Sequence, residues 1–220
     1  MGAFTNFATE ATGFGDLFPG IDPHLLTIKT HFDLPFSREI LLSLGTCSVS
    51  KRSCNYILNK GPGKSLLIVV GGAEEALNAF PNTYDLVIKK RFGFIKLAVM
   101  NGASLVPVMS FGENDIWDQV ANPQGSILRS VQLTFKKYMT FAPPLFHGRG
   151  IFSYNYGVLP HRRPITSVVG SPIDCPKIEN PNAEDVQKYQ KLYLDELQRI
   201  YDKYKDQYAP NRIKELCFVE

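Results

Sequence analysis

Long apolar runs are missing from this sequence of 220 residues. Its strongest run, residues 66–70, falls far short of the roughly 18 residues that a membrane-spanning helix needs. Residues 1–16 mix phenylalanine with glycine, threonine and glutamate, which is not the pattern of a signal peptide. If the protein works at a membrane, we expect this chain to lie on the surface or to dock to it.

The sequence also has few cysteines and only a small excess of positive charge. The net charge is only +3, from 24 basic and 21 acidic residues, which does not indicate a nucleic-acid partner but allows a local basic pocket for an anionic ligand. No Cys-x-x-Cys pair and no Asn-x-Ser/Thr site occurs. We therefore expect reduced, mostly buried thiols in a chain that faces the cytosol. The cysteines are Cys47, Cys54, Cys175 and Cys217.

Familiar catalytic motifs are absent as well. Residues 63–65 imitate a phosphate-binding loop, but the motif's first glycine would stand at Leu58, and a strand follows where a helix is required. No Gly-x-Ser-x-Gly occurs. His24 and His31 are seven residues apart, yet no neighbouring ligand completes a convincing zinc site. A nucleotide-binding domain and a resident metal are therefore disfavoured.

What the sequence does contain is an alternation of strand and helix patterns within one domain, residues 1–220. Apolar runs predict strands at 65–70, 104–109 and 165–169, the first of them buried and parallel. Helices are predicted at 91–101, ended by Gly102, and at 124–138. The alternation predicts an α/β sandwich with a largely parallel sheet flanked by helices.

The last helix gives the clearest pattern. Pro181 stands near its start, and Glu184 and Asp185 fall in its first turn, where they suit the helix dipole. Apolar and aromatic residues then recur at spacings of three and four, which predicts an amphipathic helix of about six turns. These residues are Val186, Tyr189, Tyr193, Leu197, Ile200 and Tyr204.

Three groups of residues are candidate functional sites. Gly71, Gly72 and Glu75 follow the first predicted strand, and ligands bind beyond the carboxyl ends of parallel strands; a turn with an acidic helix start is the alternative. His147 and His161 bracket a long loop, residues 143–164, as acid–base candidates or as surface residues. A basic cluster suits phosphate binding, or is a solvated helix face. It consists of Lys89, Lys90, Arg91 and Lys96.

Several blocks, in order, resemble one family of enzymes. The blocks are GAFTNF (2–7), TEATG (9–13), FPGIDPHL (18–25), VGGAEEAL (70–77), RFGFIKL (91–97), LVPVMSFGE (105–113), APPLFHGRG (142–150) and PITSVVGSPI (164–173). Together they resemble the type 2 diacylglycerol acyltransferases with their monoacylglycerol and wax-ester relatives. The resemblance covers essentially the whole chain.

The resemblance implies a glycerolipid-acyltransferase-like sandwich. It also implies transfer of an acyl group from acyl-CoA, as co-substrate, to diacylglycerol, which gives triacylglycerol with no bound cofactor. The alternatives are a monoacylglycerol or fatty-alcohol acceptor, or a non-catalytic truncated isoform. The implied location is the cytosolic face of the endoplasmic reticulum membrane and the lipid droplet. The implied partners are a membrane surface and a second copy of the chain, with no nucleic acid.

Residue roles follow from the blocks. Glu75 and His24 are the catalytic candidates, and we expect Glu75, Arg91 and Glu113 to gather around one cleft. Pro107 and Phe111 either shape that site or simply pack. Substrate binding is assigned to Gly71, Gly72, Arg91, Lys96, Glu113 and Arg149, with His147 and Arg163 as further candidates.

The family's His-Pro-His-Gly motif, to which its base is assigned, and its membrane hairpin would precede Met1. We therefore expect this chain to be truncated, and to be weak or inactive without them. The aromatic stretch at 141–146 is a candidate to enter a membrane interface, or to pack in the core.

Overall fold

The computed structural model describes residues 2–33, 35–72, 75, 79–119, 146–154 and 156–219. The chain divides into two compact units. The first comprises residues 1–70, 91–109 and 167–200, and the second comprises residues 71–90, 110–166 and 201–220. Neither unit is one continuous stretch of sequence, and the assignment of residues 1–220 to a single domain stays a prediction.

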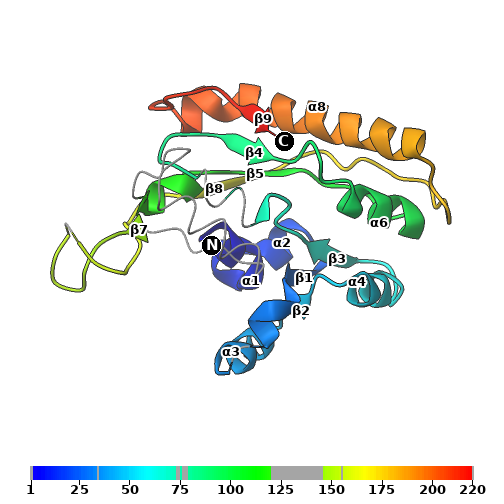
Figure 1. Ribbon diagram of the computed structural model, residues 1–220, viewed down its shortest axis with the longest axis horizontal. Coiled ribbons are helices and arrows are strands. Elements are labelled where there is room, and N and C mark those ends of the chain that lie inside the picture. The colour runs from blue at the N-terminus through cyan, green and yellow to red at the C-terminus, as the bar shows by residue number, and fades with distance from the viewer. Residues whose placement is uncertain are drawn as a thin grey trace, which may run out of the picture. The chain divides into compact units, whose positions relative to one another are not determined.

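The first unit is built from short helices and a small parallel sheet. Its elements are α1 (Gly2–Ala8), η1 (Glu10–Thr12), α2 (Phe14–Leu17), β1 (Asp22–Thr27), η2 (Lys29–Phe32), α3 (Ser37–Ser43), β2 (Cys47–Ser48), α4 (Lys51–Leu58), β3 (Lys64–Leu67) and α6 (Gly93–Asn101). The sheet has the strand order β2-β1-β3, and both pairs are parallel (Figure 1). The predicted parallel strand at 65–70 is thus confirmed as β3, although it is shorter and only partly buried.

The core of the first unit includes residues of the sheet, α4 and α6. Leu26 of β1 packs with Cys54 and Ile57 of α4, and Leu97 of α6 contacts the same cluster. α6 ends at Gly102, whose φ of 66° is favourable for glycine, so the predicted helix and its cap are confirmed.

α8 (Ala183–Tyr208) is the long amphipathic helix that the sequence predicts, and it is the longest helix in Figure 1. Asn182 caps its start: the Asn182 side chain accepts from the N–H of Asp185 at 2.7 Å, and the Asp185 carboxylate accepts from the N–H of Asn182 at 3.1 Å. Five of the six predicted face residues are buried, but Tyr204 is only partly buried and Tyr201 is fully buried.

The strand predicted at 104–109 begins later than expected. The structure places β5 at Val108–Phe111, paired with β8 (Thr166–Val169), which confirms the strand predicted at 165–169. Pro107 explains the shift because proline has no N–H to donate to a ladder. Before it, Leu105 forms only an isolated antiparallel bridge with Ile173.

The second unit contains short strands around an aromatic core. Its remaining elements are β4 (Asp85–Val87), η3 (Glu113–Ile116), β6 (Asp118–Gln119), β7 (Phe146–His147) and β9 (Cys217–Val219). β4 pairs with β9 in parallel, and β6 pairs with β7 antiparallel. The Phe111 ring centroid lies 5.8 Å from that of Tyr84, 6.4 Å from that of Tyr201 and 5.7 Å from that of Tyr208. Burial raises the pKa of Tyr84 to about 12, so this phenol stays neutral.

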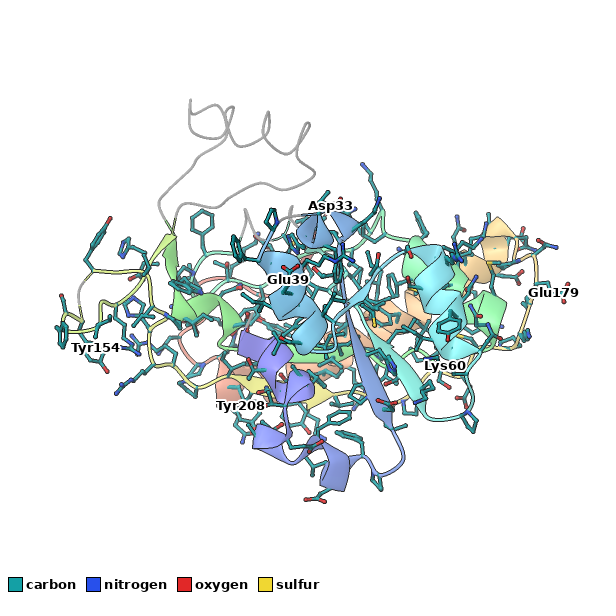
Figure 2. All side chains as sticks on the ribbon, turned by 90° about the horizontal axis from the view of Figure 1, so that it is seen from below. Asp33, Glu39, Lys60, Tyr154, Glu179 and Tyr208 are labelled. Carbon is teal, nitrogen blue, oxygen red and sulfur yellow. The ribbon has the colours of Figure 1, made fainter. Side chains whose placement is uncertain are left out.

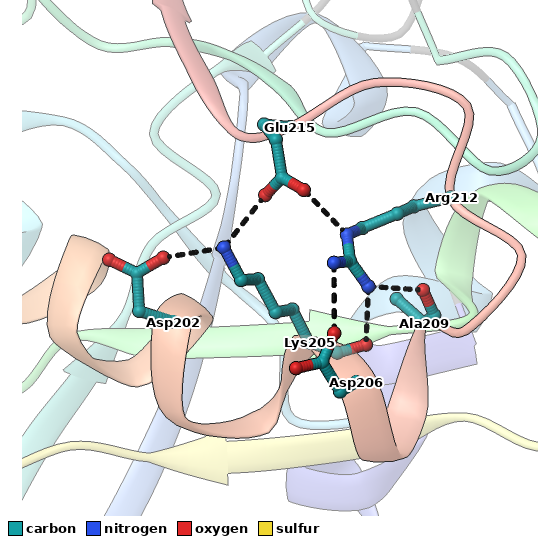
Figure 3. Close-up of polar contacts among 6 residues, drawn as sticks. All are labelled: Asp202, Lys205, Asp206, Ala209, Arg212 and Glu215. Atoms are coloured by element: carbon teal, nitrogen blue, oxygen red, sulfur yellow. Dashed lines mark hydrogen bonds and ion pairs between the residues drawn. The ribbon is translucent and has the colours of Figure 1, made fainter.

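A polar network closes the C-terminal end of α8 (Figure 3). The Arg212 guanidinium donates to the carbonyl oxygens of Lys205 and Ala209 at 3.4 and 3.3 Å, where the helix leaves acceptors unsatisfied. Arg212 also contacts Glu215 at 2.8 Å, and Lys205 contacts the other oxygen of Glu215 at 3.0 Å. These two cations hold the pKa of Glu215 at about 2.

The α/β class and parallel pairing are therefore present, but in several small sheets of the described residues. The helix predicted at 124–138 and most of the aromatic stretch at 141–146 lie outside the described residues. None of the helices in the described part of the chain combines the length and the apolar character that crossing a bilayer demands.

Candidate active site

His24 lies in β1 with its side chain mostly buried. Its Nδ1 is 3.1 Å from the backbone oxygen of Asp22. Because a carbonyl oxygen can only accept, Nδ1 carries the hydrogen of this bond, and Nε2 is the ring nitrogen left for other contacts. Lys64 of β3 pairs with the Asp22 carboxylate and holds the pKa of that carboxyl below its ordinary value. The strand therefore holds the ring in an orientation fixed through Nδ1.

The Glu75 carboxylate lies close to Gly71 and to β4. The Oε2 of Glu75 accepts a hydrogen bond from the N–H of Val87 at 3.1 Å. The same oxygen lies 2.1 Å from the point that a Cβ on Gly71 would occupy, so the carboxylate sits where a side chain would be. Gly72 is exposed next to it. Glu75 thus holds the backbone of β4, and Gly71 gives it the space.

Glu113 follows a tight turn at the end of β5. Gly112 has a φ of 83°, and a Cβ there would lie 2.2 Å from the carbonyl oxygen of Pro164. Only glycine fits that backbone, and the turn places Glu113, half-buried, as the first residue of η3. Pro107 and Phe111 are fully buried, which favours packing as their role.

Arg91 and Lys96 are exposed cations at the start of α6. Arg91 precedes Phe92, the N-cap residue, and the backbone N–H of Lys96 bonds to the Phe92 oxygen at 2.9 Å in the first helical turn. An N-terminal helix turn flanked by cations suits an anionic group.

Arg149 stabilises the loop in which it lies. Its Nε donates to the backbone oxygen of Pro160 at 3.0 Å, and an antiparallel bridge joins Arg149 to Leu159. The guanidinium is therefore partly engaged in holding Arg149 against Pro160.

The structure also brings together a group that the sequence did not assemble. His161 Nε2 lies 2.9 Å from Oδ2 of Asp118, to which it donates. His147 Nδ1 lies 3.8 Å from the same oxygen and is a buried nitrogen without a hydrogen-bond partner among the described residues. Two histidines thus face one carboxylate, an arrangement that can hold or pass a proton.

The sequence points to both histidines but not to Asp118. Both histidines flank one long loop, but their spacing of fourteen residues does not show that they meet. Asp118 joins them through the pairing of β6 with β7, in which Asp118 lies opposite His147. No local pattern around Asp118 predicts that long-range pairing.

The expected cleft shared by Glu75, Arg91 and Glu113 stays a prediction. Arg91 belongs to the first unit, and the two carboxylates belong to the second. Within the described residues, no group of three His, Cys, Asp or Glu side chains has the geometry to hold a metal ion. His31 instead contacts Thr27 Oγ1 through Nδ1 at 2.8 Å. All four cysteines are free; Cys54 and Cys175 are buried, and Cys47 and Cys217 are half-buried.

Known proteins match this chain over nearly all its length. A family model described as diacylglycerol acyltransferase matches residues 1–218. Diacylglycerol O-acyltransferase 2B of Umbelopsis ramanniana is 53% identical over 100% of this chain and 64% of its own length. Diacylglycerol O-acyltransferase 2 of Dictyostelium discoideum is 53% identical over 95% of this chain and 63% of its own length.

A relative named for a different acceptor also matches. 2-Acylglycerol O-acyltransferase 1 of Bos taurus is 46% identical over 99% of this chain and 65% of its own length. The chain therefore spans less than two thirds of each of these relatives. No solved structure matches it significantly.

Proposed function

The chain belongs to the diacylglycerol acyltransferase family, and from that premise we propose that it takes part in transfer of an acyl group from acyl-CoA to diacylglycerol. The observation that carries the proposal is the family match over residues 1–218, together with relatives 53% identical that are named for this acceptor. The product is triacylglycerol, and free coenzyme A leaves.

The proposed reaction joins the acceptor hydroxyl oxygen to the thioester carbonyl carbon. The carbon–sulfur bond then breaks, and the hydroxyl proton ends on the sulfur of coenzyme A. Such a reaction needs a group to take the proton and donors to stabilise the oxyanion of the tetrahedral intermediate. We assign proton handling in this chain to His24, because the Asp22 carbonyl orients the ring through Nδ1 and leaves Nε2 for other contacts.

Glu75 is proposed to act at the reaction or acceptor site together with Gly71 and Gly72. Its carboxylate has two separable features, a negative charge and an oxygen that accepts from Val87 N–H. Glu75→Gln keeps an accepting oxygen and removes the charge, whereas Glu75→Ala removes both. Loss of activity in both variants supports a chemical role for the charge, and loss in the alanine variant alone assigns Glu75 to backbone support.

Binding of acyl-CoA is proposed for the cations. Arg91 and Lys96 lie at the start of α6, where coenzyme phosphates would gain from both the positive charge and the helix N-terminus. Glu113 and Arg149 are proposed at the rim of the substrate site. Arg91→Ala should raise the KM for acyl-CoA, while an unchanged KM would contradict this assignment.

The finer fold and cellular assignments are part of the same proposal. We propose one acyltransferase domain with the glycerolipid-acyltransferase-like sandwich, acting at the cytosolic face of the endoplasmic reticulum and on lipid droplets. A membrane surface and a second copy of the chain are its proposed partners.

The test is expression of the chain in cells that lack triacylglycerol synthesis, followed by an assay of membranes with labelled acyl-CoA. Labelled triacylglycerol above the background of the host cells would support acyl transfer and would overturn the expectation that this chain is weak or inactive, and Arg91→Ala should lower that yield when acyl-CoA is limiting. Competition among diacylglycerol, 2-monoacylglycerol and a fatty alcohol identifies the acceptor, a question raised by the 2-acylglycerol acyltransferase relative. No labelled neutral lipid at normal expression would contradict acyl transfer by this chain.

A further inference from the structure

A loop of the second unit exposes an unusual amount of apolar surface. We call residues 150–160 the apolar loop; within eight positions, five large side chains are between 63% and 102% exposed. They are Ile151, Phe152, Tyr154, Tyr156 and Val158. Contiguous exposed apolar surface of this kind marks a site of interaction with a protein or a membrane.

Hydrogen bonds hold the base of the apolar loop. Antiparallel bridges join Gly148 to Gly157 and Arg149 to Leu159 at its base. The N–H groups of Gly148 and Arg149 each donate across this stem at 2.8 Å, and the Arg149 side chain adds its bond to Pro160. Figure 2 shows Tyr154 at the outer end of the loop, with its side chain directed away from the ribbon. The hairpin therefore presents its apolar side chains at its tip.

The sequence around the loop is mostly basic. Between Asp118 and Asp174 the sequence has no acidic residue, and the Asp118 carboxylate at the base of the loop is paired with His161. Arg162 and Arg163 follow the loop closely and are exposed. An apolar tip on a cationic base matches the two layers of an anionic bilayer surface, an acyl interior below negatively charged headgroups.

We propose that the apolar loop enters the interface of an anionic lipid bilayer. Phe152 and its apolar neighbours contact the acyl chains, the tyrosine hydroxyls stay at the headgroup level, and Arg162 and Arg163 bind lipid phosphates. A symmetric contact between two copies of this loop fits less well, because it would add a second pair of arginines to the contact while residues 150–163 supply no acidic side chain to pair with them. This inference rests on exposure and charge, and it does not depend on acyl transfer.

A matched pair of variants tests the proposal. Ile151 in the loop and Ile213 outside it are both 77% exposed, and both belong to the second unit. Ile151→Ser should weaken binding to vesicles of phosphatidylcholine and phosphatidylserine by about fivefold or more, and Phe152→Ser by about tenfold or more. Ile213→Ser should bind as the unsubstituted chain does.

A second pair of substitutions tests whether Arg162 and Arg163 contribute to binding through their charge. The double variant Arg162→Gln/Arg163→Gln should lose about tenfold in affinity for the anionic vesicles. It should lose little for vesicles of phosphatidylcholine alone, because these carry no net charge.

A depth measurement separates insertion from surface adsorption. Trp117 is the only tryptophan of the sequence, so Phe152→Trp adds a single reporter above a known background. The emission of the added indole should shift to the blue and be quenched by brominated acyl chains. Equal vesicle binding by Ile151→Ser and Ile213→Ser, or an added indole that brominated chains leave unquenched, would overturn the proposal. Loss of self-association without loss of vesicle binding would assign the loop to a second copy instead.

Discussion

Replacing Gly112 with alanine should be one of the most destabilising small changes in the second unit. Two costs arise at this position. An alanine at a φ of 83° pays the strain of the left-handed region, about 1–2 kcal/mol. Its Cβ would also lie 2.2 Å from the Pro164 oxygen, a backbone atom that cannot rotate away.

The cost of the collision with Pro164 can be estimated from the known effect of overpacking a protein core. Relieving the contact requires a backbone shift where β5 ends, and forced shifts of this kind cost about 1–3 kcal/mol. We therefore expect Gly112→Ala to lower the free energy of unfolding by about 2–5 kcal/mol. That is a large part of the roughly 5–15 kcal/mol that stabilises an ordinary domain.

Gly20 provides the control. Its φ is 82°, and nothing lies within 4 Å of a Cβ built there, so Gly20→Ala carries the strain without the collision. Urea denaturation followed by circular dichroism measures both, provided that the m-values agree with that of the unsubstituted chain. Gly112→Ala should cost more than Gly20→Ala by about 1–3 kcal/mol. Equal costs for the two variants would refute the close approach to Pro164.

Two further predictions concern a carboxylate and the thiols. Arg199, together with Ser171 N–H, holds the pKa of Glu196 at about 2, below the ordinary 4.5. The ionised Glu196 therefore stabilises the folded chain fully above pH 4.5, and this contribution is lost as the pH falls through about 2. Glu196→Gln should remove on the order of 1–3 kcal/mol at neutral pH and flatten acid unfolding across that window, measured by urea titration at several pH values; an unchanged acid profile would contradict it. Cys47 should react with a thiol reagent well before Cys54, whose burial raises its pKa, and mass spectrometry of labelled peptides checks the order.

Local patterns predicted the elements whose causes are local. The spacing of apolar residues and the acidic first turn located α8, and Gly102 located the end of α6. Tyr201 was left out of the predicted face although it lies four positions after Leu197 and so fits the same spacing. Its ring contacts with Tyr84 and Phe111, which are distant in sequence, account for its complete burial. The late start of β5 was readable in principle, since Pro107 lacks the N–H that a ladder needs.

Local sequence patterns could not predict which distant segments pair with each other. Asp118 meets His147 and His161 only because β6 pairs with β7, and no periodicity in one strand specifies its partner. The same reason explains why one largely parallel sheet was predicted where the described residues form several small ones. The family resemblance identified candidate site residues, but it did not predict which residues they contact.

Those contacts change how the resembling blocks should be interpreted. In two of them the glycine is required by packing: Gly71 makes room for Glu75, and Gly112 for the backbone of Pro164. Glu75 in turn supports Val87. A block can therefore recur among relatives because the backbone must pass closely at that point, whatever its side chains do to a substrate. A chemical role for Glu75 requires an effect of its charge on turnover that the loss of its hydrogen bond does not reproduce.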